Sequence, residues 1–347
     1  MVNIKINDIP LQVKEGTTIL DAAAQANMPV PSLCYLKGLN EIGACRVCSV
    51  EVRGVDRLVT ACNNVVAEGM EIFTNSPRVR QARRVNAQLI LSQHDCHCPT
   101  CTRSGNCNLQ KLANELGLFK LDYANHAPKF NWPYDFPLIR EAGKCIKCMR
   151  CIQICDKVQD LHVWDLSKTG SRTTVGVSYN RMIERAGCSL CGQCITHCPT
   201  GALRSRDDTE RLLSHDGAFA DKEKVTIVQV APAVRAAWGE ALGLERELAT
   251  PERLVSALKA IGFDYVFDTD FGADLTIMEE GSEFLERLRD PSQGPLPLFT
   301  SCCPGWVRFL KSQYPELTPH LSTAKSPHQM QGAMTKTYIA EKLGLDP

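Results

Sequence analysis

Eighteen cysteines in five groups constrain this chain of 347 residues more than any other feature. Two of the groups follow the pattern Cys-x-x-Cys-x-x-Cys-x-x-x-Cys, whose thiols lie too close along the chain to find separate disulfide partners easily. The amino terminus lacks the pattern of a signal peptide, and no apolar run approaches the ~18 residues of a membrane span. We therefore expect a cytoplasmic protein, in which thiols stay reduced and clustered cysteines bind metal.

Composition and charge exclude other classes of protein. The 39 basic and 39 acidic side chains balance, whereas a nucleic-acid-binding protein would carry a basic excess. A hydrophobic fraction of 44% excludes global disorder. A chain of this length predicts several domains, and we expect a multidomain α+β protein. The cysteine groups divide it into residues 1–78, 79–125, 126–210 and 222–347.

The first residues predict a β-grasp domain. Apolar and polar residues alternate over residues 2–6, and Asn7-Asp8 is a suitable two-residue turn into a second strand over residues 9–13. Thr18 is positioned to cap a helix over residues 19–26. A hairpin followed by a helix is how a β-grasp fold begins.

The first cysteine group predicts a 2Fe-2S centre in this domain. Glycines let the backbone of the cysteine loop approach cluster sulfurs, and two short strands, 50–52 and 57–59, precede the last cysteine. A four-cysteine zinc site is the alternative. The spacing of Cys34, Cys45, Cys48 and Cys62 departs from that of plant ferredoxins. It resembles the amino-terminal part of iron-only hydrogenases and of the electron-input subunit of respiratory complex I. The predicted ligands are Cys34, Cys45, Cys48 and Cys62.

Residues 77–93 predict a helix that leads into the second group. One face carries Val79, Ala82, Val85 and Leu89, and four arginines give the helix a basic character: Arg78, Arg80, Arg83 and Arg84. These arginines form either a solvated face or a docking patch for an acidic electron carrier.

A histidine precedes the cysteines that follow this helix, in the pattern His-x3-Cys-x2-Cys-x5-Cys. The pattern resembles a 4Fe-4S centre of the same two families, held by one histidine and three cysteines. Cys96 and His97 lie inside the motif, and we expect them to support the ligands rather than to be ligands. The ligands implied by the resemblance are His94, Cys98, Cys101 and Cys107.

Residues 126–210 contain an internal repeat of the run Cys-x2-Cys-x2-Cys-x3-Cys, which is typical of bacterial ferredoxins. In that fold the fourth cysteine of each run binds the other cluster. The segment between the runs, with a strand-like stretch at residues 175–179, predicts a small hairpin. Two 4Fe-4S centres are predicted, one held by Cys145, Cys148, Cys151 and Cys198 and the other by Cys188, Cys191, Cys194 and Cys155.

The last segment, residues 222–347, predicts alternating strands and helices and hence an α/β layer with a parallel sheet. The expected strands are 225–230, 265–268 and 297–299, and the expected helices are 232–242 and 273–289. The heptapeptide Thr-Ser-Cys-Cys-Pro-Gly-Trp, residues 300–306, is predicted to follow a strand and to open a helix whose positive end stabilises a thiolate.

This heptapeptide resembles the first signature of the active-site domain of iron-only (FeFe) hydrogenases. The segments at 230–235, 277–280 and 321–327 also resemble that family, so the resemblance covers the whole chain. It implies that Cys303 is a ligand of the 4Fe-4S part of the H-cluster and that Cys302 passes protons to its di-iron subsite. It further implies that Glu280, Glu283 and Ser322 relay protons from the surface.

The family carries its other three cluster cysteines further along the chain, and no cysteine follows Cys303 here. We therefore expect either a fragment of a longer hydrogenase or a shortened relative that transfers electrons without catalysis. The predicted reaction is reversible reduction of protons to dihydrogen. The predicted partners are ferredoxin, or flavin- and NAD(P)-binding iron–sulfur subunits of an electron-bifurcating complex, because no nucleotide motif is present. The complex I subunit is a weaker match because it should lack the heptapeptide.

Overall fold

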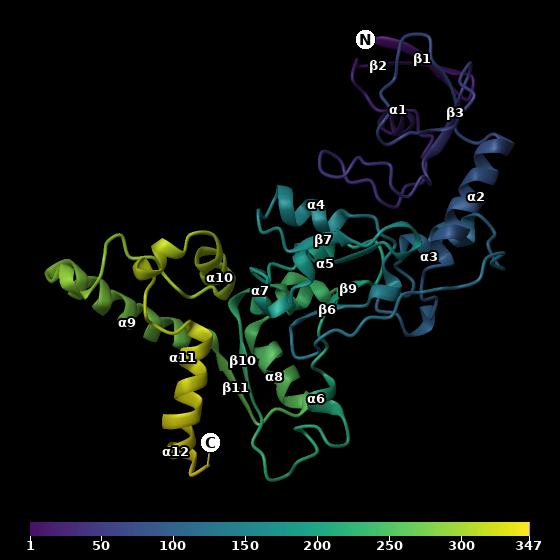
Figure 1. The fold of residues 1–347 in the computed structure, drawn as a ribbon. Coiled ribbons are helices and arrows are strands. Elements are labelled where there is room, and N and C mark those ends of the chain that lie inside the picture. The colour runs from purple at the N-terminus through teal and green to yellow at the C-terminus, as the bar shows by residue number, and fades with distance from the viewer. Residues whose placement is uncertain (347) are drawn as a thin grey trace. The chain divides into compact units, whose positions relative to one another are not determined.

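In the computed structural model, which describes residues 1–346, the chain divides into two units, residues 1–206 and 207–346 (Figure 1). The first unit begins with a five-stranded sheet of order β2-β1-β5-β3-β4, in which β1 and β5 are parallel and the other neighbours antiparallel. The predicted hairpin is confirmed, with positive φ angles at Asn7 and Asp8 in its turn. The strands are β1 (Val2–Ile6), β2 (Ile9–Val13), β3 (Ser49–Val52), β4 (Val59–Thr60) and β5 (Glu71–Phe73).

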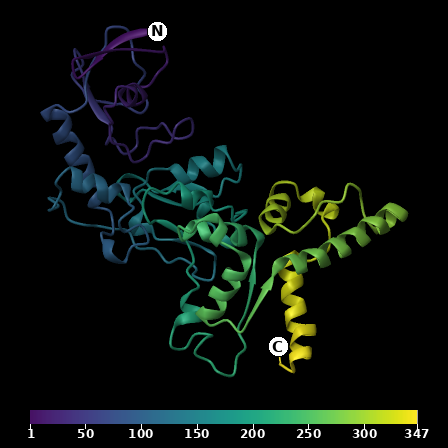
Figure 2. The same cartoon turned by 180° about the vertical axis from the view of Figure 1, so that it is seen from behind.

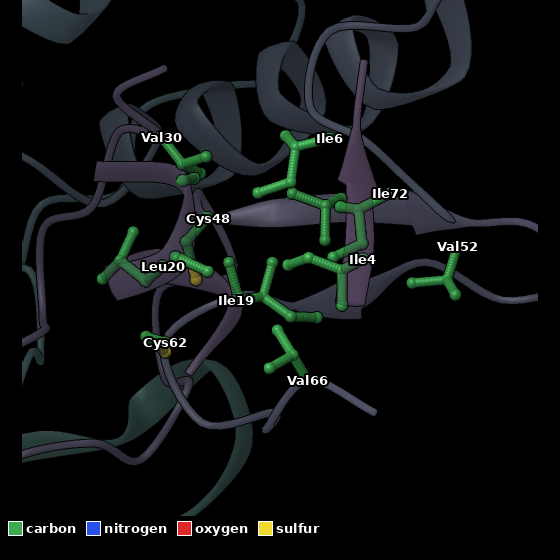
Figure 3. Packing of buried hydrophobic residues seen from close by; sticks show 14 of the residues in the cluster. Ile4, Ile6, Ile19, Leu20, Val30, Cys48, Val52, Cys62, Val66 and Ile72 are labelled. Carbon is green, nitrogen blue, oxygen red and sulfur yellow. The ribbon is translucent and has the colours of Figure 1, made fainter. Parts of the chain in front are cut away.

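A helix and this sheet enclose the first hydrophobic core (Figure 3). The helix α1 (Ile19–Gln25) begins as predicted, because the hydroxyl of Thr18 accepts a hydrogen bond from the Asp21 amide at 3.1 Å. Ile6, Ile19 and Ile72 are each at most 1% exposed. Burying each such side chain contributes roughly 1.5–3 kcal/mol. The core therefore fixes the sheet from which the first cysteine loop extends.

Helix α2 (Pro77–Leu91) ends two residues before its predicted end, and of its four arginines only Arg78 and Arg80 are exposed. Arg83 is 6% exposed and donates to the carbonyls of Val47 and Ser49 at 3.1 and 3.0 Å. Arg84 donates to the Leu116 carbonyl at the end of α3 (Asn108–Glu115). The exposed basic face is therefore confirmed only for Arg78 and Arg80, because the guanidinium groups of Arg83 and Arg84 bind carbonyls of neighbouring loops. The docking patch stays a prediction. Leu89, expected on the apolar face, is 49% exposed.

The rest of the first unit holds the cysteine repeat. β6 (Leu138–Arg140) pairs antiparallel with β9 (Leu203–Ser205), so the two ends of this region meet in one small sheet. Between them the chain forms α4 (Arg150–Lys157) and α5 (Gln193–Thr196), one for each cysteine run. The predicted hairpin between the runs is confirmed and consists of β7 (Trp164–Ser167) and β8 (Thr174–Val177).

In residues 207–346, β10 (Ile227–Val230) and β11 (Tyr265–Asp268) pair in parallel, as predicted. The predicted strand at residues 297–299 is wrong, since only Phe299 forms a bridge, with Leu321. Pro295 and Pro297 lack the N–H groups that a strand ladder needs. The heptapeptide therefore follows no strand, although it does open a helix, α10. The remaining helices are α6 (Glu210–Leu213), α7 (Pro232–Ala241), α8 (Pro251–Ile261), α9 (Thr269–Arg289), α10 (Pro304–Gln313), α11 (Pro327–Met334) and α12 (Ala340–Leu343). The sequence prediction missed α6, α8, α11 and α12.

Helices α9 and α11 pack closely near the start of α9 (Figure 2). A Cβ atom at Gly272 would lie 2.2 Å from the Pro327 carbonyl oxygen, so only glycine permits this approach. The Thr276 hydroxyl donates to the carbonyls of Gly272 and Lys325, at 2.9 and 3.3 Å. The contact fixes the segment before α11 against α9. Among residues 1–346, no helix combines the length and the apolar character needed to cross a membrane.

Candidate metal centres

The four cysteines of the first group converge in a buried site. Cys34, Cys48 and Cys62 are fully buried and Cys45 is 8% exposed. Hydrogen bonds from the thiols of Cys45 and Cys62 lower the pKa of Cys34, and the same contacts raise the pKa values of both partners. Side-chain contacts join Cys34 to Cys45, Cys34 to Cys62 and Cys62 to Cys48. Four thiols connected in this way are a suitable donor set for an iron–sulfur cluster.

A positive φ angle at Gly43 shapes the loop between Cys34 and Cys45. Gly43 has φ of 64°, and a Cβ there would lie 3.1–3.2 Å from the side chains of Asn63 and Thr60. A larger residue would push this loop away from the segment that carries Cys62. The glycine therefore belongs to the geometry of the cysteine site.

The second group surrounds a separate cavity. His94, Cys98 and Cys107 line this cavity together with Cys96, whereas Cys101 does not line it. His94 is 7% exposed, burial lowers its pKa, and its Nδ1 atom has no hydrogen-bond partner among residues 1–346. A buried imidazole nitrogen without a partner fits a metal ligand, because leaving it unsatisfied costs free energy.

Cys101 lies instead against the loop that follows Cys198. A Cβ atom at Gly201 would lie 2.8 Å from Cys101 Sγ, so glycine lets the two loops approach. Arg103 donates to the Cys198 carbonyl at 2.8 Å, and Cys107 Sγ lies 3.9 Å from the Pro199 carbonyl oxygen. The second cysteine group is therefore adjacent to the last cysteine of the repeat.

Cys96 and His97 lie at the surface of this region. Cys96 is exposed, and its thiol donates to the His94 carbonyl at 3.4 Å. The imidazole of His97 is largely exposed and pairs with Asp95. The expectation that Cys96 and His97 support the ligands rather than bind metal stays a prediction.

The repeat places its eight cysteines around two cavities. One cavity is lined by three cysteines of the first run and the last of the second: Cys145, Cys148, Cys151 and Cys198. The other is lined by the complementary set: Cys155, Cys188, Cys191 and Cys194. The structure therefore brings together the same sets of four that the sequence predicted.

The two cysteine runs share the same backbone conformation. Positive φ angles occur at Lys147 and Met149 in the first run and at the equivalent Leu190 and Gly192 in the second. Met149 and Gly192 are the residues that precede α4 and α5. Each run thus turns twice in the same way before its helix begins, so the sequence repeat is also a structural repeat.

The thiols in these cavities are strongly desolvated. Burial raises the pKa of Cys148 and Cys194 to about 12 and that of Cys155 to about 11. Thiolates in such surroundings need a nearby positive charge, which bound iron supplies. The donor chemistry of both cavities therefore fits 4Fe-4S clusters.

The second unit holds the cysteine pair at the start of α10. Both Cys302 and Cys303 are exposed. Cys303 caps α10, since its Sγ accepts a hydrogen bond from the Trp306 amide at 3.5 Å. The residue before the pair, Ser301, donates its amide to Glu280 Oε1 at 3.2 Å and its hydroxyl to the Ala324 carbonyl at 3.0 Å.

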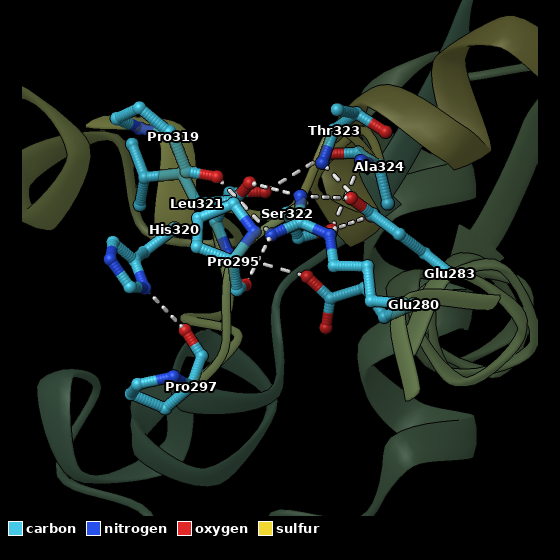
Figure 4. Close-up of polar contacts among 12 residues, drawn as sticks. Glu280, Glu283, Pro295, Pro297, Pro319, His320, Leu321, Ser322, Thr323 and Ala324 are labelled. Carbon is cyan, nitrogen blue, oxygen red and sulfur yellow. Dashed lines mark hydrogen bonds and ion pairs between the residues drawn. The ribbon is translucent and has the colours of Figure 1, made fainter. Parts of the chain in front are cut away.

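Two of the predicted relay residues are in direct contact (Figure 4). The Ser322 hydroxyl donates to Glu283 Oε2 at 2.9 Å, and the Thr323 amide donates to the same oxygen at 3.0 Å. Arg287 donates to Glu283 Oε1 at 2.6 Å. Burial raises the pKa of Glu283, but these three donors outweigh it and the net pKa is lowered. Glu280 is separate from this group and contacts Ser301.

The sequence prediction missed Arg287, whose side chain is 4% exposed. Its guanidinium also donates to the carbonyls of Pro295, Pro319 and Leu321, at 3.1–3.2 Å. The i, i+4 spacing of Glu283 and Arg287 on a predicted helix could have indicated the pair. The backbone acceptors could not have been found, because they depend on how the loops fold.

Four families match successive parts of the chain. Residues 1–77 match a 2Fe-2S iron-sulfur cluster binding domain, and residues 83–120 match the NADH-ubiquinone oxidoreductase-G iron-sulfur binding region. Residues 144–202 match a 4Fe-4S dicluster domain. Residues 224–347 match the iron only hydrogenase large subunit, C-terminal domain. The chain therefore contains 2Fe-2S, 4Fe-4S and hydrogenase domains in that order.

The similarity to individual proteins extends along the whole chain. It is 43% identical over 355 residues to the NADP-reducing hydrogenase subunit HndD of Solidesulfovibrio fructosivorans, covering 99% of this chain and 60% of that protein. It is 37% identical over 357 residues to iron hydrogenase 1 of Clostridium pasteurianum, covering 100% of this chain and 60% of that protein. This chain therefore spans about 60% of the length of these curated relatives.

One solved structure shares the fold of a large part of the chain. It is a chain from an NAD+-reducing NiFe-hydrogenase in the H2-reduced state, with a TM-score of 0.55 and 22% identity, covering 59% of this chain and 87% of that chain. At this identity the likeness concerns the fold alone. The chain is therefore similar to iron-only hydrogenases along its whole length, and it matches 2Fe-2S and 4Fe-4S domains ahead of its match to the hydrogenase C-terminal domain.

Proposed function

We propose that this chain is part of an iron-only hydrogenase that interconverts protons and dihydrogen, 2 H+ + 2 e− ⇌ H2. Residues 1–206 would conduct electrons through one 2Fe-2S and three 4Fe-4S clusters. The observation that carries this proposal is the pair of cavities in the repeat, each lined by three cysteines of one run and the fourth of the other. That exchange is the ligand pattern of two-cluster ferredoxins.

The proposed cluster ligands are those that the sequence pattern and the family resemblance imply. The buried sulfurs of the first group would hold the 2Fe-2S cluster in a domain whose sheet order and helix support the β-grasp interpretation. His94, with its unpartnered nitrogen, would join Cys98, Cys101 and Cys107 on the adjacent 4Fe-4S cluster. The proximity of Cys101 and Cys107 to the loop after Cys198 supports electron exchange between this cluster and the repeat.

Residues 207–346 would contribute to the catalytic centre. The H-cluster, a 4Fe-4S cluster with a di-iron subsite, supplies the metal chemistry when bound. Cys303, at the start of α10, would be a thiolate ligand, and Cys302 beside it would exchange protons at its Sγ atom. Glu280 contacts the residue next to Cys302 through the Ser301 amide. Glu283 and Ser322 share a hydrogen bond and would pass protons between them.

We also propose that the chain exchanges electrons with ferredoxin, or with flavin- and NAD(P)-binding iron–sulfur subunits in an electron-bifurcating complex. The similarity to a subunit of an NADP-reducing hydrogenase supports partner subunits of the second kind. The chain itself contains no nucleotide-binding motif, so a reaction with NAD(P)H would need such a partner.

The test is metal analysis and infrared spectroscopy of the complete native gene product, purified without oxygen after expression with the maturation enzymes. We expect roughly 14 irons in the clusters of residues 1–206, together with the cyanide and carbonyl bands of a di-iron subsite. Zinc in place of iron would overturn the cluster assignment.

A second candidate is an electron-transfer subunit with a hydrogenase domain that does not catalyse. The exposure of both Cys302 and Cys303 favours it, because within the described residues these two thiols are not enclosed in a buried site as most cysteines of the repeat are. Full iron content without the infrared bands would support this second candidate and exclude the first.

A further inference from the structure

One buried side chain touches two of the proposed ligand sets. Asn40 is fully buried, and its Nδ2 atom donates to the Cys34 carbonyl at 2.7 Å and to the Cys148 carbonyl at 2.8 Å. Cys34 belongs to the 2Fe-2S set and Cys148 to the first 4Fe-4S set. An amide NH2 group has two protons, so both bonds form at once.

The orientation of this amide is determined by its acceptors. Both neighbouring groups are carbonyl oxygens, which accept hydrogen bonds only, so the NH2 group of Asn40 must face them. Its Oδ1 atom is buried and has no hydrogen-bond partner within residues 1–346. The oxygen therefore adds little to the site, and the function of the side chain lies in its two N–H groups.

The loop that carries Asn40 is held at both ends. The backbone of Asn40 exchanges two hydrogen bonds with Leu36, at 2.7 and 3.1 Å, which closes the loop on itself. From α4, Arg150 donates to the Tyr35 carbonyl at 2.7 Å and Lys157 to the Leu39 carbonyl at 2.8 Å. Asn40 is thus positioned by two independent sets of contacts.

Water is excluded from the surroundings of this junction. Cys34, Cys45 and Cys148 belong to one buried apolar cluster with side chains from the loop, α2 and α3: Leu33, Val47, Ala87, Leu91, Leu109 and Leu112. Hydrogen bonds in such low-dielectric surroundings are stronger than in water. The link between the two carbonyls is therefore short, dry and rigid.

We infer that Asn40 is the positioning residue through which the 2Fe-2S and first 4Fe-4S centres exchange electrons. This inference rests on the proposed function, since it requires both clusters. In the transfer, one iron of the first centre is oxidised as the second centre gains one electron, and no bond or proton changes. Electrons tunnel more readily through covalent and hydrogen bonds than across an empty gap, and the Asn40 amide supplies such a path between the two ligand residues.

A second, weaker contact lies beside this path. Arg150 Nε also donates to the Cys34 carbonyl, at 3.3 Å, and Arg150 is bonded to the proposed ligand Cys151. Removing the Asn40 amide should therefore slow the exchange rather than abolish it.

The test compares the wild-type chain with Asn40→Leu, which keeps the branching at Cγ and removes both donors, and with the smaller Asn40→Ala. A flash photoreductant adds one electron, and rapid-freeze electron paramagnetic resonance follows the 2Fe-2S and 4Fe-4S signals. We expect both variants to keep their iron and their reduction potentials, and to redistribute the electron at least fivefold more slowly. The matched control is Asn86→Leu, because the Asn86 amide donates to the Arg46 carbonyl of the same cysteine loop without reaching the repeat.

Exchange within twofold of the wild-type rate in an iron-replete Asn40 variant overturns the inference. So does equal slowing in Asn86→Leu, which would mean that any disturbance of the cysteine loop has this effect. If Asn40→Leu loses iron, the result for Asn40→Ala decides. Absence of both signals from the wild-type protein would instead overturn the proposed function, so the two failures are distinguishable.

Discussion

The cysteines of the two units lie in opposite surroundings. In residues 1–206 only Cys96 and Cys191 are exposed, and Cys191 still lines a cavity with three buried cysteines. In residues 207–346 both members of the pair Cys302-Cys303 are exposed. The first unit therefore forms its proposed sites from its own residues, whereas the second presents its thiols at the surface.

The hydrophobic residues differ in the same way. The first unit buries its large side chains, among them Ile6, Ile72 and Ile139. In the second unit, α9 exposes several large apolar side chains: Phe271, Ile277, Met278, Phe284, Leu285 and Leu288. An apolar surface of this kind is typical of an interaction face. The comparison teaches that the first unit buries both its core and most of its proposed ligands, whereas the second leaves apolar side chains of α9 and the cysteine pair exposed.

The largest expected effect is on iron content. Cys198→Ala should remove about four irons per chain, because this thiol is buried in a cavity with three other proposed ligands. Iron and acid-labile sulfide analysis of the purified chain measures the loss. Cys96→Ala and Cys302→Ala are the controls, and both should retain all the iron of residues 1–206. Equal loss of iron from Cys96→Ala would instead make that exposed thiol a ligand.

A smaller effect is expected on the free energy of unfolding when a packed side chain is shortened. Ile72→Ala should destabilise the first sheet by about 2–4 kcal/mol, since Ile72 is 1% exposed. Ile277→Ala should change stability by less than about 0.5 kcal/mol, since Ile277 is 68% exposed. Hydrogen exchange followed by mass spectrometry resolves the two units separately, which bulk unfolding of a multidomain chain does not. A comparable loss of protection in Ile277→Ala would reveal that α9 is covered in the purified protein.

The sequence predicted the first unit better than the second, for physical reasons. Cysteine spacing fixes which thiols can share a cluster, so the sets that meet in the repeat could be named in advance. Short strands such as residues 2–6 follow from a local alternation of residues. In the second unit, the Phe299–Leu321 bridge joins segments distant in sequence, and two prolines prevented the strand expected there. The carbonyls that bind Arg83 and Arg287 also depend on tertiary folding, so no local pattern could reveal them.

The smallest expected effect is on how stability depends on pH, through the carboxylate of Glu283 in α9. Glu283 has a lowered pKa, so its charge stabilises the folded chain above the unfolded pKa of about 4.3, and this stabilisation is lost as pH falls through the folded pKa. Glu283→Gln removes the charge opposite the buried Arg287 and should cost about 1 kcal/mol at pH 7.

Hydrogen exchange measures the stabilisation that the Glu283 charge provides. The quantity to follow is the ratio of exchange rates in Glu283→Gln and the wild type, for peptides that contain Ser322 and Thr323. The ratio should be largest at neutral pH and approach one in acid, while peptides of the first sheet should show no difference. Glu316→Gln is a suitable control, because Glu316 forms no ion pair within the described residues. A ratio that stays constant with pH would mean that Glu283 acts through its shape and neutral hydrogen bonds.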